Sequence, residues 1–390
     1  MIQEIKNWLR NLLIRLHVLR DKSEEIYISK LSDDKPWVYV AYISRPFFHK
    51  DDDEYMSTHQ NKREAIVQTD IFNELGYNVY VQHYSSTKEI PNIKFDIVFG
   101  HEPNFVRAAN KNPSALKIHY VPGAYVTHRN GQIKKMTDYV NKTYNSSIPY
   151  RRLLNEDNSC GNVKTAYNIA DSILLIGSKY TVETFPIELH NKIVTIHQST
   201  QLTHTIDNID YSPENEYFFM GSGGNLLKGI SLLLEFFSMH KDYKLNIVGP
   251  VEADVKEALK ELISDNIIMH GFVDVNSDNM IDIMSHCNFV IYPSGSEGGM
   301  PGAVLNSMKN GLIPVVTKWA AFDEIEEYGY ILDGWTVDAI AKGIAWSQSL
   351  SQDEVVRLKR SGAAFVERTF NIDNYKKEFR SFIIQNTRKN

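Results

Sequence analysis

Apolar residues along the chain fall into short runs, which alternate with stretches where they recur at helical spacing. β-branched and aromatic residues dominate the short runs, as is typical of buried strands. Before residue 200, the pattern predicts strands at 36–43, 78–82, 95–99, 116–121, 172–176 and 192–196. After residue 200, it predicts strands at 217–220, 243–248, 267–271, 289–292 and 313–317. Strands that alternate with helices pair in parallel through right-handed crossovers, so we expect an α/β protein.

The 390 residues are enough for two domains of ordinary size. A polar run from His197 to Glu216 separates the two groups of strands and indicates a linker. We place the N-terminal domain at 30–207, the C-terminal domain at 208–370 and a last helix within 371–390. Other helices are expected at 59–75, 230–240, 252–263, 279–285, 334–350 and 353–370, and from residue 302 onward. No apolar run approaches the roughly 20 residues that span a bilayer.

Residues 1–22 carry a pattern of their own. Apolar side chains recur there at helical spacing, and five basic residues stand against two acidic ones. No small-residue cleavage site follows, so the segment is not a secretory signal. An amphipathic basic helix that contains a tryptophan suits a membrane interface. It equally suits docking on a domain or a partner subunit, and both interpretations stay open.

Composition narrows the class of protein. Apolar residues make up 43% of the chain and charged residues 23%, which is ordinary for a globular protein. The net charge of −6 argues against a general nucleic-acid binder, which needs a basic surface. Two cysteines, Cys160 and Cys287, exclude a disulfide framework and favour a reduced, cytoplasmic setting.

The segment between the strand at 217–220 and the helix at 230–240 has the chemistry of an anion site. Its glycines leave backbone N–H groups free to face a ligand, and the following helix dipole favours negative charge. Lys228 adds a full positive charge beside them. The alternative is a tight turn with a surface lysine. The glycines concerned are Gly221, Gly223 and Gly224.

A second loop, from Pro293 to Gly302, joins the strand at 289–292 to a helix. Its glycines allow a sharp bend and a close approach of a ligand to the backbone. Glu297 lies in the middle of this loop. A carboxylate there does not favour phosphate, but it can accept hydrogen bonds from the hydroxyl groups of a sugar. The alternative is that Glu297 caps the following helix.

These two loops also carry a family resemblance. The run Ser294-Gly-Ser-Glu-Gly, then Pro301, Leu305-Asn-Ser-Met308, Gly311 and Pro314-Val-Val resembles the donor segment of glycosyltransferase family 4, a retaining GT-B family. The segment Gly221 to Lys228-Gly229 resembles the phosphate loop of the same family. Two residues depart from the pattern. Ser222 stands where the family usually has an arginine, and Asn306 stands where it usually has a second glutamate.

The resemblance implies the GT-B fold: two Rossmann-like parallel-sheet domains that face a cleft, with a C-terminal helix crossing back onto the N-terminal domain. It also implies that Lys228 and Glu297 act on the donor, with retention at the sugar and without a bound metal or other cofactor. A histidine of the first domain often lies near the reacting sugar in this family. His119 is our first choice for it, and His101 and His128 are the other acceptor-side candidates. The implied donor-binding residues are Gly221, Gly223, Gly224, Lys228, Phe272, Glu297, Gly298, Gly299, Met300, Pro301 and Asn306.

We therefore expect a hexosyltransferase that takes a sugar from a nucleotide-diphosphate sugar. The expected acceptor is a glycan or a lipid-linked molecule, as in the synthesis of bacterial cell-surface polysaccharide. The expected location is the cytoplasm, with residues 1–22 as the candidate contact to the membrane face. Two alternatives stay open: a nucleotide-sugar 2-epimerase of the same fold, and a partner subunit that binds a nucleotide sugar without turnover.

Overall fold

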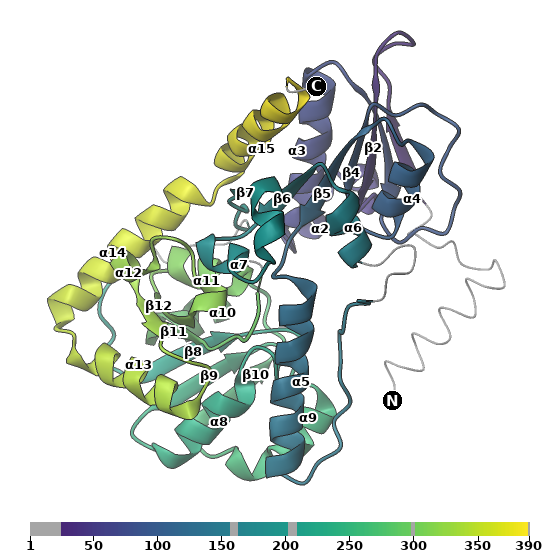
Figure 1. The fold of residues 1–390 in the computed structure, drawn as a ribbon. Coiled ribbons are helices and arrows are strands. Elements are labelled where there is room, and N and C mark those ends of the chain that lie inside the picture. The colour runs from purple at the N-terminus through teal and green to yellow at the C-terminus, as the bar shows by residue number, and fades with distance from the viewer. Residues whose placement is uncertain (1–24, 157–162, 202–208, 298–300, 389–390) are drawn as a thin grey trace.

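The computed structural model describes residues 25–156, 163–201, 209–297 and 301–388 (Figure 1). The expected helix at 1–22, the predicted domain boundary at 208 and the predicted donor residues Gly298, Gly299 and Met300 lie outside the described residues. The described part of the chain forms two α/β lobes, each built on one sheet. Within that part, no helix is long and apolar enough to cross a membrane.

The sheet of the N-terminal domain has seven strands in the order β1-β3-β2-β4-β5-β6-β7. They are β1 (Ile26–Ser29), β2 (Trp37–Tyr42), β3 (Asn78–His83), β4 (Ile97–Gly100), β5 (Leu116–Val121), β6 (Ser172–Ile176) and β7 (Ile193–Ile196). All neighbours pair in parallel except β1, which pairs antiparallel with β3 at the edge. We predicted every strand of this sheet except β1. The side chains of β1 are half-buried or exposed, so its apolar pattern is weak.

Alternate residues of β2 enter two separate cores, one on each face of this sheet. Tyr39 and Ala41 belong to the core under α4 and α6, whereas Val38 and Val40 belong to the core under α3. The helices of the domain are η2 (Arg45–Phe48), α2 (Asp53–Ser57), α3 (Asn61–Glu74), α4 (Asn104–Lys111), α5 (Val126–Thr143), α6 (Val163–Ile169), α7 (Lys179–Val182) and η3 (Ile187–Lys192).

The sheet of the C-terminal domain is fully parallel, in the order β10-β9-β8-β11-β12-β13. The strands are β8 (Glu216–Met220), β9 (Lys244–Val248), β10 (Ile267–Gly271), β11 (Cys287–Tyr292), β12 (Ile313–Thr317) and β13 (Tyr330–Leu332). The short edge strand β13 was not predicted. The helices are α8 (Ile230–Met239), α9 (Ala253–Ala258), η4 (Lys260–Leu262), α10 (Asp278–Ser285), α11 (Gly302–Lys309), η5 (Lys318–Ala320), α12 (Ile325–Tyr328), α13 (Val337–Ser349), α14 (Gln352–Thr369) and α15 (Ile372–Thr387).

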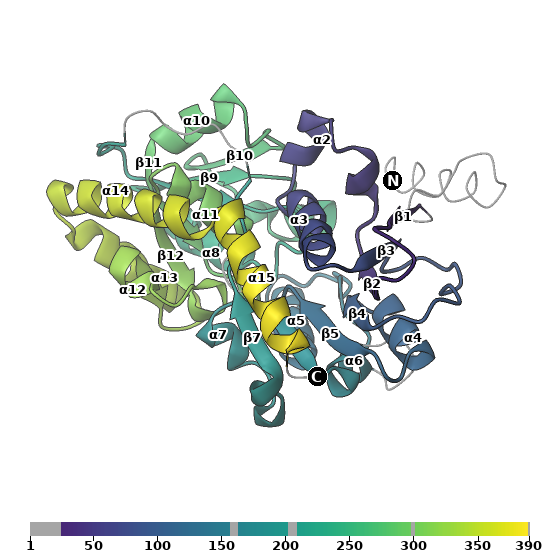
Figure 2. The ribbon, with the colours of Figure 1, turned by 90° about the horizontal axis from the view of Figure 1, so that it is seen from above.

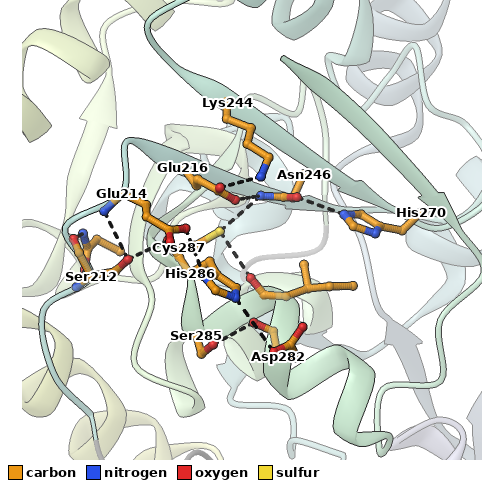
Figure 3. A network of polar contacts seen from close by, with 12 residues as sticks. Ser212, Glu214, Glu216, Lys244, Asn246, His270, Asp282, Ser285, His286 and Cys287 are labelled. Atoms are coloured by element: carbon orange, nitrogen blue, oxygen red, sulfur yellow. Dashed lines mark hydrogen bonds and ion pairs between the residues drawn. The ribbon is translucent and has the colours of Figure 1, made fainter. Parts of the chain in front are cut away.

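A network of polar side chains ties four strands of this sheet together (Figure 3). Glu216 accepts hydrogen bonds from Lys244 Nζ at 2.5 Å and from Asn246 Nδ2 at 2.6 Å. The Oδ1 atom of Asn246 lies 2.9 Å from His270 Nε2, and the Asn246 amide also reaches Cys287 Sγ at 3.6 Å. Burial raises the pKa of the Cys287 thiol to about 12, so this cysteine is an unreactive core residue.

The N-terminal domain extends an arm onto the C-terminal domain. We call residues 126–156 the strap: α5 and the segment that follows it. In Figure 1 the strap runs down beside α8, α9 and β10, and Met136, Val140 and Ile148 are part of the core of the C-terminal domain. Arg151 forms an ion pair with Asp254 of α9 that joins the end of the strap to that domain. We predicted neither the helix nor its docking.

The C-terminal helix makes the reverse crossing, as the expected fold class requires. After α14 the chain turns, and α15 lies along α3 of the N-terminal domain (Figure 2). The buried residues Tyr375, Phe379, Phe382 and Ile383 complete one of the two N-terminal cores. The Phe379 ring lies 5.8 Å from the Phe72 ring and 5.5 Å from the Phe99 ring, both in edge-on contact.

Candidate active site

The two loops singled out in the sequence lie side by side at the carboxyl edge of the C-terminal sheet. They follow β8 and β11, which are neighbouring parallel strands. The Gly295 N–H donates a hydrogen bond of 2.8 Å to the Leu227 carbonyl, and Ser294 Oγ donates to the same oxygen at 3.3 Å. The loop with Lys228 and the loop with Glu297 are therefore joined by their own backbones.

Close packing at two glycines keeps the loops in contact. At Gly229, φ is +83°, and a Cβ atom there would lie 2.2 Å from the Pro293 carbonyl oxygen. At Gly295, a Cβ atom would lie 2.5 Å from the Trp335 ring. The indole N–H of Trp335 also donates to the Pro293 carbonyl at 2.8 Å. A side chain at Gly229 would push the two loops apart, and a side chain at Gly295 would displace Trp335.

Lys228 and Glu297 act electrostatically on one another across this joint. Burial lowers the pKa of Lys228, and the Glu297 carboxylate opposes that effect. The ammonium donates to the Ser222 carbonyl at 3.3 Å. Glu297 Oε1 accepts from Tyr292 Oη at 3.1 Å and from Ser294 Oγ at 3.2 Å, which fixes the carboxylate. The geometry places one cation and one oriented anion at the same end of the sheet.

The glycine loop is less open than the sequence suggests. Glu252 accepts hydrogen bonds from the Gly224 N–H and from the Asn225 side chain, the latter at 2.7 Å. The Gly224 amide, one of the predicted phosphate donors, is thus already occupied by a carboxylate. Gly221 N–H is bonded to the Val248 carbonyl at 2.9 Å. The prediction that these two amides face a ligand does not fit this structure, because both have partners within the domain.

Two arginines of the strap also lie at these loops, and we did not predict either of them from the sequence. Arg152 Nη1 donates to the Gly223 carbonyl at 3.2 Å, and Arg129 Nη1 donates to the Arg152 carbonyl at 2.7 Å. The positive charge of Arg152 lowers the pKa of Lys228, after the larger effect of burial. No local motif marks either arginine. Only the docking of the strap brings Arg129 and Arg152 to the two loops.

The comparisons with known proteins agree with this arrangement. Residues 214–347 match the family model described as Glycosyl transferases group 1. The structure of sucrose-phosphate synthase from Thermosynechococcus elongatus is similar with a TM-score of 0.60, at 12% identity over 91% of this chain and 100% of that one. No curated protein matches the chain by sequence.

Two further solved structures have the same architecture at low identity. Anabaena HepE in complex with UDP-glucose has a TM-score of 0.53, at 11% identity over 90% of this chain and all of that one. Staphylococcus aureus TarM, in complex with fondaparinux, α-GlcNAc-glycerol and UDP, has a TM-score of 0.50, at 11% identity over 74% of this chain and 55% of that one. Residues 214–347 thus carry the match to a glycosyltransferase family, and the described chain has the two-lobed GT-B fold of these solved structures. This confirms the expected fold class.

Other predicted donor residues lie at the same edge of the sheet. Phe272 follows β10 directly, and its side chain is 83% exposed. Pro301 precedes the first turn of α11. Asn306 lies further along that helix, where its amide donates to Gln201 Oε1 of the linker at 2.7 Å. In this structure Asn306 therefore holds the linker, and its assignment to the nucleotide stays a prediction.

Among the three candidate histidines, His128 is the one that reaches the donor loop. Its Nε2 lies 3.1 Å from the Gly295 carbonyl oxygen, and its ring packs against Trp319 at 5.3 Å between centroids. Burial lowers the pKa of His128, so the neutral ring with a proton on Nε2 fits this contact. His128 is at the start of α5 and belongs to the strap.

His119, our first choice, lies inside the N-terminal domain. It is 1% exposed and stacks on Phe105, with Nε2 3.0 Å from Glu102 Oε2. The structure does not bring it to Lys228 or Glu297, because β5 turns this side chain into the core. His101 is half-buried in the same domain, and burial lowers its pKa to about 4. The burial of His119 argues against its contact with a sugar in this conformation.

We predicted no clustered metal ligands, but the fold forms one cluster among the described residues. His101, Glu102 and His119 each offer a ligand atom, and these atoms lie within 4.8 Å of one another. Burial opposes ionisation of Glu102, but the hydrogen bond from His119 and the electrostatic interactions with His119 and His101 together outweigh it and lower the pKa of Glu102 to about 2. His119 Nδ1 is buried without a partner. A metal on Nε2 would place a proton on Nδ1 with nothing to accept it, so a Glu–His hydrogen bond fits better.

Proposed function

We propose that this glycosyltransferase transfers a hexosyl group from a nucleoside-diphosphate sugar to a glycan or lipid-linked acceptor, with retention at the anomeric carbon. The observation that carries the proposal is the backbone joint between the loops of Lys228 and Glu297. A cation beside the departing diphosphate stabilises the charge that develops there. A fixed carboxylate beside it orients the sugar hydroxyl groups.

The comparisons support the kind of substrate. HepE is described in complex with UDP-glucose, and TarM with UDP and an α-GlcNAc-glycerol, so two proteins of this fold bind a uridine nucleotide. A role in the assembly of a cell-surface polysaccharide follows from the expected acceptor. We propose further that the reaction needs no metal, because the diphosphate charge is met by side-chain cations of the protein.

The test is release of nucleoside diphosphate from a panel of UDP-, GDP- and dTDP-sugars. We expect slow hydrolysis of one sugar, an anomeric configuration retained in the product, and no loss after dialysis against EDTA. Lys228→Ala and Glu297→Ala should each lower the rate by roughly 100-fold or more. Lys142→Ala, at an exposed position on α5, is the control for loss of one positive charge.

Three other outcomes would contradict the proposal. Conversion of a nucleotide sugar to its epimer without nucleotide release would make the protein an epimerase. If the protein bound a nucleotide sugar but did not turn it over with any of the acceptors supplied, it would be a non-catalytic partner subunit. Hydrolysis that persists in both the Lys228 and Glu297 variants would place the reaction elsewhere in the chain.

We also propose that residues 1–22 bring the enzyme to the cytoplasmic face of a membrane, where lipid-linked glycans are built. The support is the amphipathic, basic pattern of that segment. Flotation of the full chain with vesicles that contain anionic lipid should recover it, and a chain that lacks residues 1–22 should stay at the bottom. Equal recovery of both would contradict the idea.

A further inference from the structure

Three cations lie close to the place where the loop of Lys228 and the loop of Glu297 are hydrogen-bonded to one another. Lys228 comes from the loop after β8, Arg129 from α5, and Arg152 from the end of the strap. Arg129 donates to the Arg152 carbonyl at 2.7 Å, and Arg152 donates to the Gly223 carbonyl at 3.2 Å. A Cβ atom at Gly224 would lie 3.3 Å from Arg152 Nη1, so the guanidinium lies directly against the glycine loop.

These charges repel one another. Burial and then Arg152 lower the pKa of both Lys228 and Arg129. Within the described ranges, none of the three forms an ion pair with a carboxylate. The nearby Glu297 offsets part of the repulsion at both residues, and Glu252 offsets a smaller part at Lys228. Like charges gathered in this way raise the free energy of the empty site, and an anionic ligand lowers it.

The backbone of the strap is also held in a costly conformation at this point. Arg152 has a φ of +59°, in the left-handed region that side chains other than glycine seldom adopt. Hydrogen bonds on both sides fix it there. The Asn130 side chain bonds the N–H and the carbonyl of Leu154 at 3.0 and 2.8 Å, and Arg151 is paired with Asp254. The surroundings therefore aim the Arg152 side chain at the glycine loop.

We infer that Arg152 is a phosphate-binding residue of the donor site, which the strap of the N-terminal domain supplies to the C-terminal domain. The inference rests on the proposed function and adds a residue to it. The guanidinium has five N–H donors in a planar fork that matches phosphate, and one donor is used on Gly223. Ser222, which is exposed beside Lys228, carries no charge, so Lys228 is the cation that the glycine loop itself offers. Arg152 of the strap adds a second cation at this place.

A consequence is that neither domain holds the complete diphosphate site. Lys228 and Glu297 belong to the C-terminal domain, whereas Arg152 arrives only when the strap is docked. Donor binding should then stabilise the docked strap, and a docked strap should increase the affinity for the donor by the same factor.

The test measures binding of UDP and of UMP by calorimetry to the full chain. Arg152→Ala should weaken UDP binding about 10- to 100-fold, as expected for charge-assisted hydrogen bonds, and should weaken UMP binding much less. The UDP affinity of Arg152→Lys should lie between those of wild type and Arg152→Ala, because a lysine keeps the positive charge but not the planar fork of N–H donors. Lys134→Ala, exposed on the same strap, removes the same charge and should leave both affinities unchanged.

A second variant separates a phosphate contact from a merely structural role. Ser222→Arg in the Arg152→Ala background returns a guanidinium to the loop from the other side. We expect it to restore most of the preference for UDP over UMP without restoring the strap contact. Equal UDP affinity of wild type and Arg152→Ala would overturn the inference and leave the proposed function intact. Failure of the wild-type chain to bind UDP, GDP, dTDP or ADP would overturn both.

Discussion

Glu64 is a carboxyl group completely buried on α3, beside the linker that leaves the N-terminal domain. Its Oε1 accepts hydrogen bonds from the Ser199 N–H at 2.7 Å and from Ser199 Oγ at 2.8 Å. Burial raises the pKa of Glu64 to about 7, although these bonds and the Arg63 charge oppose the rise. The linker is thus fastened to α3 by a group that titrates near neutral pH.

The raised pKa makes stability depend on pH. The folded protein keeps the Glu64 proton between about pH 4.5 and 7, where the unfolded chain has lost it, so stability falls as the pH rises through this window. The penalty above pH 7 is at most roughly 3 kcal/mol. Glu64→Gln keeps an acceptor for Ser199 and does not titrate. We expect it to melt progressively higher than wild type as the pH is raised from 5 to 8.

The control is Glu89→Gln, at an exposed position of the same domain. Its melting temperature should follow that of wild type across the pH range. A difference between Glu64→Gln and wild type that does not change between pH 5 and pH 8 would show that Glu64 does not titrate in this window.

Among the secondary-structure elements, the pair of loops after β8 and β11 shows what local sequence can predict. Each loop lies between a buried apolar strand and a helix, so both its position and its chemistry are visible locally. Parallel strands end at the same edge of a sheet, so both loops were expected at one edge. Whether they touch depends on whether their strands are neighbours in the sheet. The parallel pairing of β8 with β11 decides this, and the Gly295 to Leu227 hydrogen bond then joins the two loops.

Other elements have no local signal. The edge strand β1 is exposed, and β13 has only three residues, so neither shows a clear apolar pattern. The strap contains the long helix α5, whose buried residues Met136 and Val140 pack in the core of a domain whose first strand, β8, begins only at Glu216. Arg152 depends on such a distant contact, whereas the cluster at His101 forms where the residues after β4 meet the neighbouring strand β5. Spacing along the chain identified Lys228 and Glu297, but it could not identify residues whose role is set by the packing of another domain.

At the scale of the whole molecule, the two domains exchange helices. The strap leaves the N-terminal domain and enters the core of the C-terminal one, and α15 makes the opposite crossing. Contacts at the cleft join the domains as well: the Ala124 N–H donates to the Glu297 carbonyl at 3.2 Å, and the Lys179 N–H to Asp323 at 2.7 Å. The core of the C-terminal domain and one of the two N-terminal cores therefore include side chains from a distant part of the sequence, so damage at the C-terminus should appear in the N-terminal sheet.

Phe379→Ala tests this exchange. The side chain is fully buried on α15 against Phe72 and Phe99, so its removal should cost about 3–5 kcal/mol. We expect faster amide hydrogen exchange in β2, β4 and β5 of the N-terminal domain than in β8 and β11, although residue 379 lies near the C-terminus. Phe365→Ala on α14, which packs on Phe322 within the C-terminal domain, should show the reverse. If Phe379→Ala loosened only the C-terminal strands, the crossing helix would contribute nothing to the stability of the N-terminal core.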